Sequence, residues 1–535
     1  MWILPNILLA CRPSPRVLKP LPSVRCGWGH EAMTAPLTKN LILGDVSWSS
    51  PLEKSDAPMA PLVVDLDGTL TPTDTLVESV IQLIKQSPLN LLKLPFWLVR
   101  GRAAFKEKVA SLTAIDPALL PYRPALLAYL QQEKTKGRLL VLATAAHRSV
   151  AEGVAAHLGL FDAVLATDVN HNLKGKSKLD AIRARVGEKF VYAGDSRVDM
   201  PIWLCSEAAI LVGASPRLAR SIRQQMLVER EFTESTGNYR IWVKALRVHQ
   251  WVKNLLLFVP LLTAFSFTKM SALTTVVIAF LAFSFAASAT YIINDLWDLQ
   301  SDRRHPRKRF RPFACASLPI LKGLAAAAAL MTIALIVALA ISKAFFFMLV
   351  LYVVLTSAYS WVLKEYVLID AIMLSILYTL RIIAGAVAIG VSTSSWLLAF
   401  SVFIFLSLAL VKRCSELVSL DLVGSAATQG RDYRVTDLAV LWPLGVGAAL
   451  SSVVVFGLFI SATDTQERYA APTLLWFVAL GLIYWLTRLW IKTSRGEMHD
   501  DPIIYALKDA GSRITIVTMI ITMVIAHLFN LSAFL

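Results

Sequence analysis

Residues 289–317 read ATYIINDLWDLQSDRRHPRKRFRPFACAS, an apolar segment that runs into acidic and then basic residues. Asn294, Asp298 and Asp302 recur every fourth residue, so a helix would place their side chains on one face. Such a polar face at the inner edge of a membrane is costly unless a partner neutralises it. Oxygen ligands suit Mg²⁺, which commonly binds one or two carboxylates together with substrate phosphate oxygens. The stretch therefore predicts a site for Mg²⁺ and phosphate at the membrane edge.

A basic loop follows the acidic residues directly. Its cations are Arg303, Arg304, Arg307, Lys308, Arg309 and Arg311. Arginine binds phosphate through a planar fork, and lysine binds it as a point charge. A basic loop alone also fits the positive charge typical of inner membrane loops, which needs no ligand. The adjacent acids do nothing for topology, so the combined cluster favours phosphate binding.

The pattern N-D-x-x-D-x-x-x-D, followed by H-P-x-K-R-F-R-P, resembles the first signature of the UbiA-type intramembrane prenyltransferases. The resemblance is to the branch that contains decaprenyl-phosphate phosphoribosyltransferase, and it extends over roughly the C-terminal half of the chain. It implies an all-α polytopic membrane domain. It also implies Mg²⁺ ligands at Asn294, Asp298 and Asp302, with Asp298 as the catalytic carboxylate.

Composition also indicates a membrane protein. The 535 residues are 56% hydrophobic and 17% charged, with a mean hydropathy of +0.59, which is too apolar for a soluble protein. The net charge of +16 suits inner-face loops and anionic phosphate substrates, and no nucleic-acid-binding motif accompanies it. The cysteines show no metal-ligand spacing and are interpreted as reduced thiols: Cys11, Cys26, Cys205, Cys315 and Cys414.

The apolar segments predict about nine transmembrane spans of roughly 20 residues each. They lie near residues 254–270, 273–293, 320–341, 344–362, 367–390, 395–411, 436–461, 473–491 and 512–531. The main loop cations fall on one side if the N-terminus is cytoplasmic. We therefore expect an integral protein of a bacterial inner or plasma membrane, and the sequence leaves formation of a homo-oligomer open.

An α/β domain is predicted ahead of the spans. We expect a poorly ordered segment over residues 1–57, a doubly wound domain over 58–225, a linker over 226–240 and the membrane domain over 241–535. Polar residues follow three predicted strands: Asp65 and Asp67 after 61–64, Thr144 after 139–143, and Asp195 and Asp199 after 190–193. The carboxyl ends of parallel strands share one sheet edge, where such folds gather their ligands.

Carboxylates at that edge can hold Mg²⁺ and a phosphate while one of them attacks phosphorus. The motifs match, in order, those of the haloacid dehalogenase superfamily. The resemblance implies that Asp65 is the nucleophile, which forms an aspartyl phosphate, and that Asp67 is the general acid and base. It implies a Mg²⁺ site formed by these two residues with Asp195 and Asp199. A decayed, inactive domain is the alternative.

The same resemblance implies that Thr144 and one lysine bind the phosphoryl group. The candidates are Lys174, Lys176 and Lys178, and the distance to the following helix pattern favours Lys176 without separating the three. An insert near residues 75–135 predicts a helical cap that selects the substrate.

One segment of the predicted cap, residues 91–98, is unusually apolar for an exposed helix. Contact with the membrane or with the neighbouring domain would explain this composition. A buried core within the cap would explain it equally well, and the sequence alone does not separate these interpretations.

The stretch 242–254 mixes aromatic residues with cations, as an interfacial belt does. It contains R-x-x-Q-W-V-K-N, which recurs in the UbiA-type family, and the resemblance implies that Lys244 reaches the phosphoribosyl donor. Tyr291 and Lys308 would bind phosphates of the same donor.

The second half of the membrane site lacks a second acidic cluster. Asp370 has Leu374 one helical turn later, whereas Lys364 and Arg381 make the region cationic. One acidic cluster and one basic patch fit one Mg-diphosphate donor and one bare phosphate acceptor. We therefore expect transfer of 5-phosphoribosyl from phosphoribosyl diphosphate to a polyprenyl (decaprenyl-type) phosphate, with Lys364 steering the lipid phosphate.

The attached domain would then remove the 5-phosphate of the lipid-linked product, although another small phosphate ester would also fit it. The alternative for the membrane domain is prenyl transfer from a polyprenyl diphosphate to an aromatic acceptor. The missing second acidic cluster argues against that reaction. A transporter or a sensor of lipid precursors would explain the spans but not two sets of Mg²⁺ and phosphate ligands.

Overall fold

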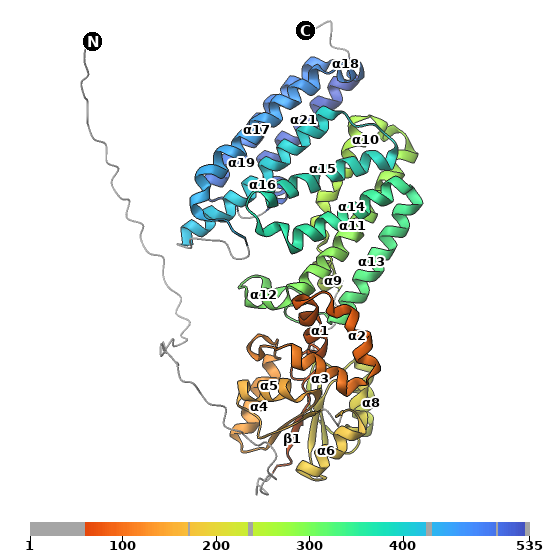
Figure 1. The fold of residues 1–535 in the computed structure, drawn as a ribbon, viewed down its shortest axis with the longest axis vertical. Helices are drawn as coiled ribbons and strands as arrows, with labels where there is room; N and C mark the ends of the chain where they lie inside the picture. The colour runs from red at the N-terminus through yellow and green to blue at the C-terminus, as the bar shows by residue number, and fades with distance from the viewer. Residues whose placement is uncertain (1–58, 169–171, 234–238, 424–430, 499–500, 530–535) are drawn as a thin grey trace, which may run out of the picture. The chain divides into compact units, whose positions relative to one another are not determined.

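A computed structural model describes residues 59–168, 172–233, 239–423, 431–498 and 501–529. The segment 1–57, for which little order was expected, lies outside the described residues. A parallel sheet with its helices comes first in the described chain, and a bundle of long apolar helices follows (Figure 1). The predicted combination of an α/β domain and an all-α membrane domain is confirmed.

The sheet has six parallel strands in the order β3-β2-β1-β4-β5-β6. The strands are β1 (Leu62–Val64), β2 (Leu140–His147), β3 (Ala163–Thr167), β4 (Val191–Gly194), β5 (Ala208–Val212) and β6 (Val228–Phe232). The chain moves outward from β1 on one side and then returns to continue on the other. The three strands that precede the predicted motifs, β1, β2 and β4, are therefore neighbours.

Helices cover both faces of this sheet. Leu62 and Val64 point to the face packed by α4 (Pro124–Thr135) and α5 (Arg148–Leu158). Val63 points to the opposite face, where it packs with α6 (Lys176–Val186), α7 (Met200–Trp203) and α8 (Pro216–Gln225). Side chains of a strand alternate between faces, and here both faces are buried, which explains the uninterrupted apolar run of β1.

Part of the expected linker belongs to the sheet. Residues 228–232 form β6, which pairs in parallel with β5. The sequence VEREF has the polar composition of a linker because β6 is an edge strand. Glu229 is nevertheless structural, since it accepts hydrogen bonds from Arg138 at 2.7 and 3.1 Å.

A helical cap follows β1, as the sequence predicted. It contains α1 (Thr75–Gln86), α2 (Asn90–Val99) and α3 (Arg102–Leu112). Asp74 caps the first helix, because its carboxylate accepts the backbone N–H of Val77 at 3.1 Å. Residues 124–135, also expected to belong to the cap, form α4 and pack on the sheet.

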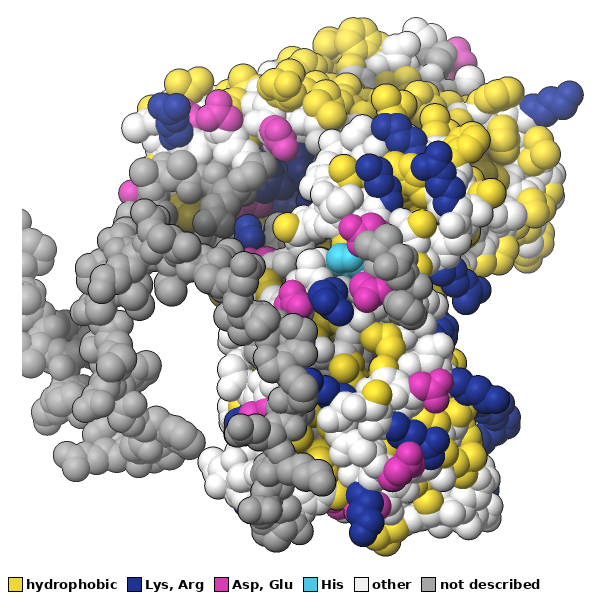
Figure 2. Space-filling model, turned by 60° about the horizontal axis from the view of Figure 1, so that its bottom comes forward, with side chains coloured by type: hydrophobic (Ala, Val, Ile, Leu, Met, Phe, Trp, Pro, Cys, Tyr) yellow, Lys and Arg dark blue, Asp and Glu magenta, His cyan; other side chains and the backbone are white. Residues whose placement is uncertain are grey.

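The remaining chain contains eight described helices that are long and apolar enough to cross a membrane. They are α11 (Met270–Trp297), α13 (Ile320–Ile341), α14 (Lys343–Trp361), α15 (Ile369–Ile389), α16 (Ser395–Val423), α17 (Leu438–Ser461), α19 (Leu475–Ser494) and α21 (Ala510–Leu528). Hydrophobic side chains cover much of this bundle's surface on the face drawn in Figure 2, whereas charged side chains are interspersed over the α/β domain.

The first of the nine expected spans is not a single long helix in the described chain. The segment near 254–270 contains the end of a 3₁₀ helix, Val248–Phe258, and the short helix α10 (Val259–Thr263). Phe265 then adopts a positive φ of 50° and interrupts the helical path. Hydropathy identified the apolar composition of this segment correctly, but it did not predict that the helix is interrupted.

Helix α15 lies between two apolar cores of the bundle. Tyr378 and Ile382 pack into the core formed with α16, α17, α19 and α21. Leu380 and Ala384 pack into the core formed with α11, α13 and α14. The polar residues of α15 are therefore held where both halves of the bundle meet (Figure 1).

Replacing Gly385 of α15 with alanine should destabilise the bundle. A Cβ at this position would lie 2.1 Å from the backbone oxygen of Leu257, which has no side-chain freedom with which to retreat. Overpacking of this kind costs about 1–3 kcal/mol, so the thermal midpoint of the detergent-solubilised protein should fall. Gly447→Ala in α17 is the matched control, because no heavy atom lies within 4 Å of its Cβ position. Equal midpoints for the two variants would contradict this packing.

Candidate active sites

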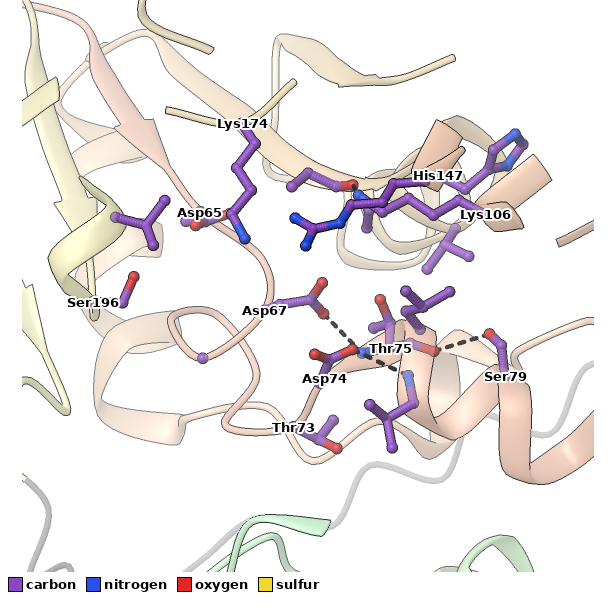
Figure 3. Close-up of a pocket in the computed structure, with 18 of the residues that line it drawn as sticks. Asp65, Asp67, Thr73, Asp74, Thr75, Ser79, Lys106, His147, Lys174 and Ser196 are labelled. Carbon is purple, nitrogen blue, oxygen red and sulfur yellow. Dashed lines mark hydrogen bonds between the residues drawn. The ribbon is translucent and has the colours of Figure 1, made fainter. Parts of the chain in front are cut away.

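A cavity of about 830 Å³ opens at the carboxyl ends of β1, β2 and β4 (Figure 3). Its wall includes residues of the strand ends, of the cap and of the segment 316–321 that leads into α13. Asp65, Asp67, Asp195 and Asp199 all line it, as the sequence predicted from the strand ends. Sheet topology thus brings residues far apart in the sequence into one site.

Three of these carboxylates form a tight group. Asp65, Asp195 and Asp199 each contribute one oxygen, and these oxygens lie within 4.8 Å of one another. Burial raises the pKa of Asp195 to about 7, with further contributions from Asp199 and Asp65. Burial also raises the pKa of Asp65, although Lys178 opposes this shift. Crowded hard oxygen donors whose ionisation is disfavoured fit a divalent cation such as Mg²⁺.

Gly68 makes room for this group. It has a positive φ of 79°, and a Cβ added there would lie 2.4 Å from a carboxylate oxygen of Asp195. Any larger residue would combine backbone strain with a clash against the carboxylate. The glycine of D-L-D-G-T-L therefore has a steric role in the site.

The side chain of Asp67 lies outside that group of three. Its carboxylate accepts the backbone N–H of Thr75 at 2.9 Å and faces the start of the cap (Figure 3). Burial raises the pKa of Asp67 to about 7, and the neighbouring Asp74 adds to the shift. A carboxyl group that exchanges a proton near neutral pH suits acid and base chemistry. The geometry thus fits the predicted proton-transfer role of Asp67 better than its predicted role as a metal ligand.

The geometry favours Lys178 over Lys176, the lysine that the sequence favoured. Lys178 is buried, and its Nζ lies 2.8 Å from Asp65 and 2.7 Å from the hydroxyl of Tyr192. Lys176 is exposed at the first position of α6. Leu179 and Ile182 fix the inward face of α6, which turns Lys178 toward the strand ends. Exposed Lys174 lines the cavity as well (Figure 3).

Thr144 is fully buried within β2, three residues before the strand ends at His147. Its hydroxyl oxygen accepts the backbone N–H of Ala146 at 3.0 Å. The residues that line the cavity from this strand are Ala145, Ala146 and His147. In this structure Thr144 therefore orders the strand end, and its predicted contact with a phosphoryl group stays a prediction.

Two cationic or titratable residues at the cavity were not predicted. Lys106 of α3 donates to the backbone oxygen of Ala145 at 2.6 Å and to the amide oxygen of Asn172 at 3.0 Å. His147 at the end of β2 contacts Glu107 at 2.5 Å. No motif marks Lys106 in the cap or His147 at the end of β2, so only the packing of α3 over the strand ends reveals them.

The residues of the predicted polar face in the membrane domain lie on two helices instead of one. Asn294 lies in α11 and Asp298 ends it, whereas Asp302 belongs to the short helix α12 (Leu299–Arg304). Asp298 is about one-third exposed, and the amide nitrogen of Asn294 donates to Ser360 at 3.0 Å. Asp302 is buried and pairs with Arg311 at 2.6 Å. Two of the three predicted ligands, Asn294 and Asp298, therefore belong to the more open part of the face.

Cations surround this face. Lys364 lies 4.0 Å from Asp298, which brings together residues predicted to act on donor and acceptor. The guanidinium of Arg247 sits 5.0 Å from the ring centre of Tyr291 and pairs with buried Asp295. The role of Arg247 was not predicted, although the residue opens the motif R-x-x-Q-W-V-K-N.

Lys244 and Lys308, the other predicted donor ligands, are both exposed. The Nζ of Lys244 donates to the backbone oxygen of Phe310 at 3.0 Å. This bond ties α9 (Tyr239–Ala245) to the basic loop that contains Lys308. The structure thus brings the two predicted lysines to one polar region.

Asp370 does not form an open second acidic site. It is fully buried at the start of α15, where Arg413 pairs with it at 2.5 Å and the hydroxyl of Tyr433 donates to it. Arg381 lies deeper in the bundle, where it is buried and donates to Asn254 at 3.0 Å and to Tyr352 at 3.1 Å. Its partners in this structure are internal.

A second polar cluster was missed as a unit. Asp501 lies 2.8 Å from Lys253 and 3.6 Å from Lys412. These residues come from the 3₁₀ helix before α10, from α16 and from the residue that caps α20 (Pro502–Lys508). Each of these residues lies in a charged stretch that is visible in the sequence, but the sequence did not show that the three stretches meet in space.

Comparisons with known proteins agree with this division of the chain. Residues 255–502 match the UbiA prenyltransferase family, and residues 62–203 match the haloacid dehalogenase-like hydrolases. The two matches fall on the helical bundle and on the α/β domain, respectively. They support an enzyme with both kinds of domain.

Three relatives are similar over long stretches. The uncharacterized protein y4nM of Sinorhizobium fredii is 38% identical over 84% of this chain and 88% of its own length. Nodulation protein NoeC of Azorhizobium caulinodans is 32% identical over 54% of this chain and 93% of its own. Decaprenyl-phosphate phosphoribosyltransferase of Mycobacterium tuberculosis is 34% identical over 42% of this chain and 74% of its own. The chain therefore belongs to the UbiA prenyltransferase family, as an integral membrane protein with a haloacid dehalogenase-like hydrolase domain before its membrane helices.

Proposed function

We propose that the membrane domain transfers 5-phosphoribosyl from phosphoribosyl diphosphate to a polyprenyl phosphate of the decaprenyl type. The observation that carries this proposal is that two carboxylates of the membrane domain differ in exposure and in pairing. Asp298 stays partly exposed, 4.0 Å from Lys364, whereas Asp370 is buried and neutralised by Arg413. One open acidic site beside a lysine suits one metal-bound diphosphate and one bare phosphate. The relatives named decaprenyl-phosphate phosphoribosyltransferase support the same substrates.

In the proposed transfer, an oxygen of the lipid phosphate bonds to C1 of the ribose. The bond from C1 to the diphosphate oxygen breaks, and its electron pair leaves with the diphosphate. Asn294 and Asp298 would hold Mg²⁺, which when bound neutralises the leaving group. Lys364 would bring the acceptor phosphate to the same face, while Tyr291, Lys244 and Lys308 bind the donor phosphates. Catalysis is then mainly orientation and charge neutralisation.

Prenyl transfer to an aromatic acceptor is the alternative reaction for this family. That reaction uses a prenyl diphosphate, for which a second open acidic cluster would be suited. The pairing of Asp370 with Arg413 removes the carboxylate at the corresponding position. We therefore favour phosphoribosyl transfer.

For the α/β domain we propose a Mg²⁺-dependent phosphatase that removes the 5-phosphate of the lipid-linked product on the cytoplasmic side. An oxygen of Asp65 attacks phosphorus, the ester P–O bond breaks, and Asp67 gives a proton to the departing oxygen. Water then attacks phosphorus of the aspartyl phosphate, with Asp67 as base, and releases inorganic phosphate. Lys178, 2.8 Å from Asp65, would neutralise charge on the phosphoryl oxygens. The oxygen donors of Asp65, Asp195 and Asp199 would hold the metal.

Asp298→Asn should abolish most transfer of labelled phosphoribose into polyprenyl phosphate, because the variant loses the open carboxylate charge. We expect a decrease of about 10²–10³ in rate, as for loss of a group that stabilises transition-state charge. The assay uses the full chain in membranes, labelled phosphoribosyl diphosphate, Mg²⁺ and extraction into organic solvent. Glu467→Gln neutralises an exposed carboxylate in the short helix α18 (Thr463–Arg468) and should keep wild-type activity. Transfer of a prenyl group to an aromatic acceptor, without lipid labelling, would overturn the proposal.

Two lysine variants separate the candidates at the phosphatase site. Lys178→Ala should lower hydrolysis of p-nitrophenyl phosphate by about 10²-fold, through loss of a buried charge beside the nucleophile. Lys176→Ala removes an exposed lysine from the same helix and should leave the rate unchanged. Asp65→Asn should abolish both this hydrolysis and release of the 5-phosphate from the lipid product. Equal losses in the two lysine variants would contradict the assignment of Lys178.

A further inference from the structure

Helix α2 of the cap presents an apolar stripe to the outside. Leu89, Leu92, Phe96 and Val99 follow one another at helical spacing along one side. Their exposed fractions are 68, 68, 74 and 88%, respectively. None of the residues of α2 is buried within the described chain. Four large apolar side chains in one stripe form a surface of the kind that binds a protein or a membrane.

The charges around the stripe have one sign. Lys93 lies within α2, and Arg100 and Arg102 follow it directly. The segment 87–106 contains no acidic residue. An apolar helix flanked by cations complements the interface of a bilayer that carries anionic lipids. A second protein surface would have to supply both apolar area and negative charge.

A shared cavity places this helix near the membrane bundle. The cavity wall contains Leu98 from the last turn of α2 and Leu321 from the first turn of α13, which is a candidate membrane span. Leu321 is itself 57% exposed. The end of α2 and the beginning of this span therefore line one cavity.

Helix α1, which precedes α2, is also fixed to the bundle. Arg303 of α12 donates two hydrogen bonds to buried Glu78, at 2.7 and 2.8 Å. Thr73 donates to the same carboxylate at 2.5 Å, and this residue follows the motif that contains Asp65. Lys85 at the other end of α1 donates to the backbone oxygen of Trp297 at 3.1 Å. These bonds join the cap to the inner ends of α11 and α12.

We propose that the apolar stripe of α2 docks on the bilayer surface next to α13, with an anionic phospholipid membrane as its partner. The stripe lies in the interfacial region, and Lys93, Arg100 and Arg102 contact lipid phosphates. The mouth of the Asp65 cavity, lined by Leu98 and Leu321, then opens at the lipid surface. Its substrates are phosphate esters anchored in the membrane, a consequence that rests on the proposed phosphatase function.

Photocrosslinking tests the docking without requiring activity. The photoreactive amino acid p-benzoylphenylalanine replaces Phe96 in the full chain, held in nanodiscs of phosphatidylcholine and phosphatidylglycerol. After illumination, mass spectrometry should find phospholipid attached at position 96. The same replacement at Leu227 is the matched control, since this leucine is 71% exposed and precedes β6 at the sheet end opposite the cavity. Leu227 should give no lipid adduct.

A paired activity measurement tests the consequence. The double variant Leu92→Glu/Phe96→Glu should release the 5-phosphate from labelled lipid product in nanodiscs about tenfold more slowly. The two introduced charges weaken binding of α2 to the bilayer interface. Hydrolysis of soluble p-nitrophenyl phosphate should stay unchanged, which shows that the domain remains folded. Leu227→Glu should change neither rate.

The outcomes separate the two proposals. No lipid adduct at position 96, or an adduct to a second copy of the chain, would overturn docking on the bilayer. Equal loss of both phosphatase rates in the α2 variant would overturn the link between docking and substrate access. A lipid adduct at position 96 in a wild-type chain that hydrolyses no phosphate ester would support docking and overturn the phosphatase proposal instead.

Discussion

A carboxylate held among apolar helices has to be paired, and this requirement organises the polar end of the membrane domain. Buried Asp295 contacts Arg247 and Arg311, and buried Asp302 shares Arg311. Removing one partner from such a pair leaves a charge that neither water nor protein stabilises. These internal pairs bring α11, α12 and the basic loop together. The carboxylate left more open is Asp298, beside Lys364, which is why this position suits a ligand.

In the α/β domain, by contrast, the clustered carboxylates outnumber the cations in contact with them. Asp65, Asp195 and Asp199 are crowded at one sheet edge, and Lys178 is the cation in direct contact with Asp65. One lysine does not balance three carboxylates, and burial raises the pKa of Asp195 to about 7. This excess of negative charge favours a bound divalent cation. Charge imbalance thus marks the candidate metal site of the α/β domain, whereas the balanced pairs of Asp295 and Asp302 in the membrane domain form a structural network.

Local sequence was sufficient where a motif sits at the end of an element. Strand ends gave the positions of Asp65 and Asp199, because parallel strands in a doubly wound sheet share one edge. Sequence was insufficient where helix orientation decides the contact. Lys176 and Lys178 differ by two positions, about 200° around a helix, so one faces water while the other faces Asp65. Strand β6 was mistaken for linker because an edge strand tolerates charged residues.

The sequence by itself determined the two kinds of domain, eight of the nine expected apolar spans and the strand ends at which the candidate carboxylates lie. These properties depend on composition and on periodicity along neighbouring residues, which the chain displays directly. Tertiary structure alone decided which carboxylates are paired, because Asp370 meets Arg413 and Asp501 meets Lys253 only after distant helices pack. It also decided that residues 248–263 form short helices and that α2 keeps its apolar stripe exposed. Charge neutralisation and burial are long-range properties, and a linear pattern does not specify them.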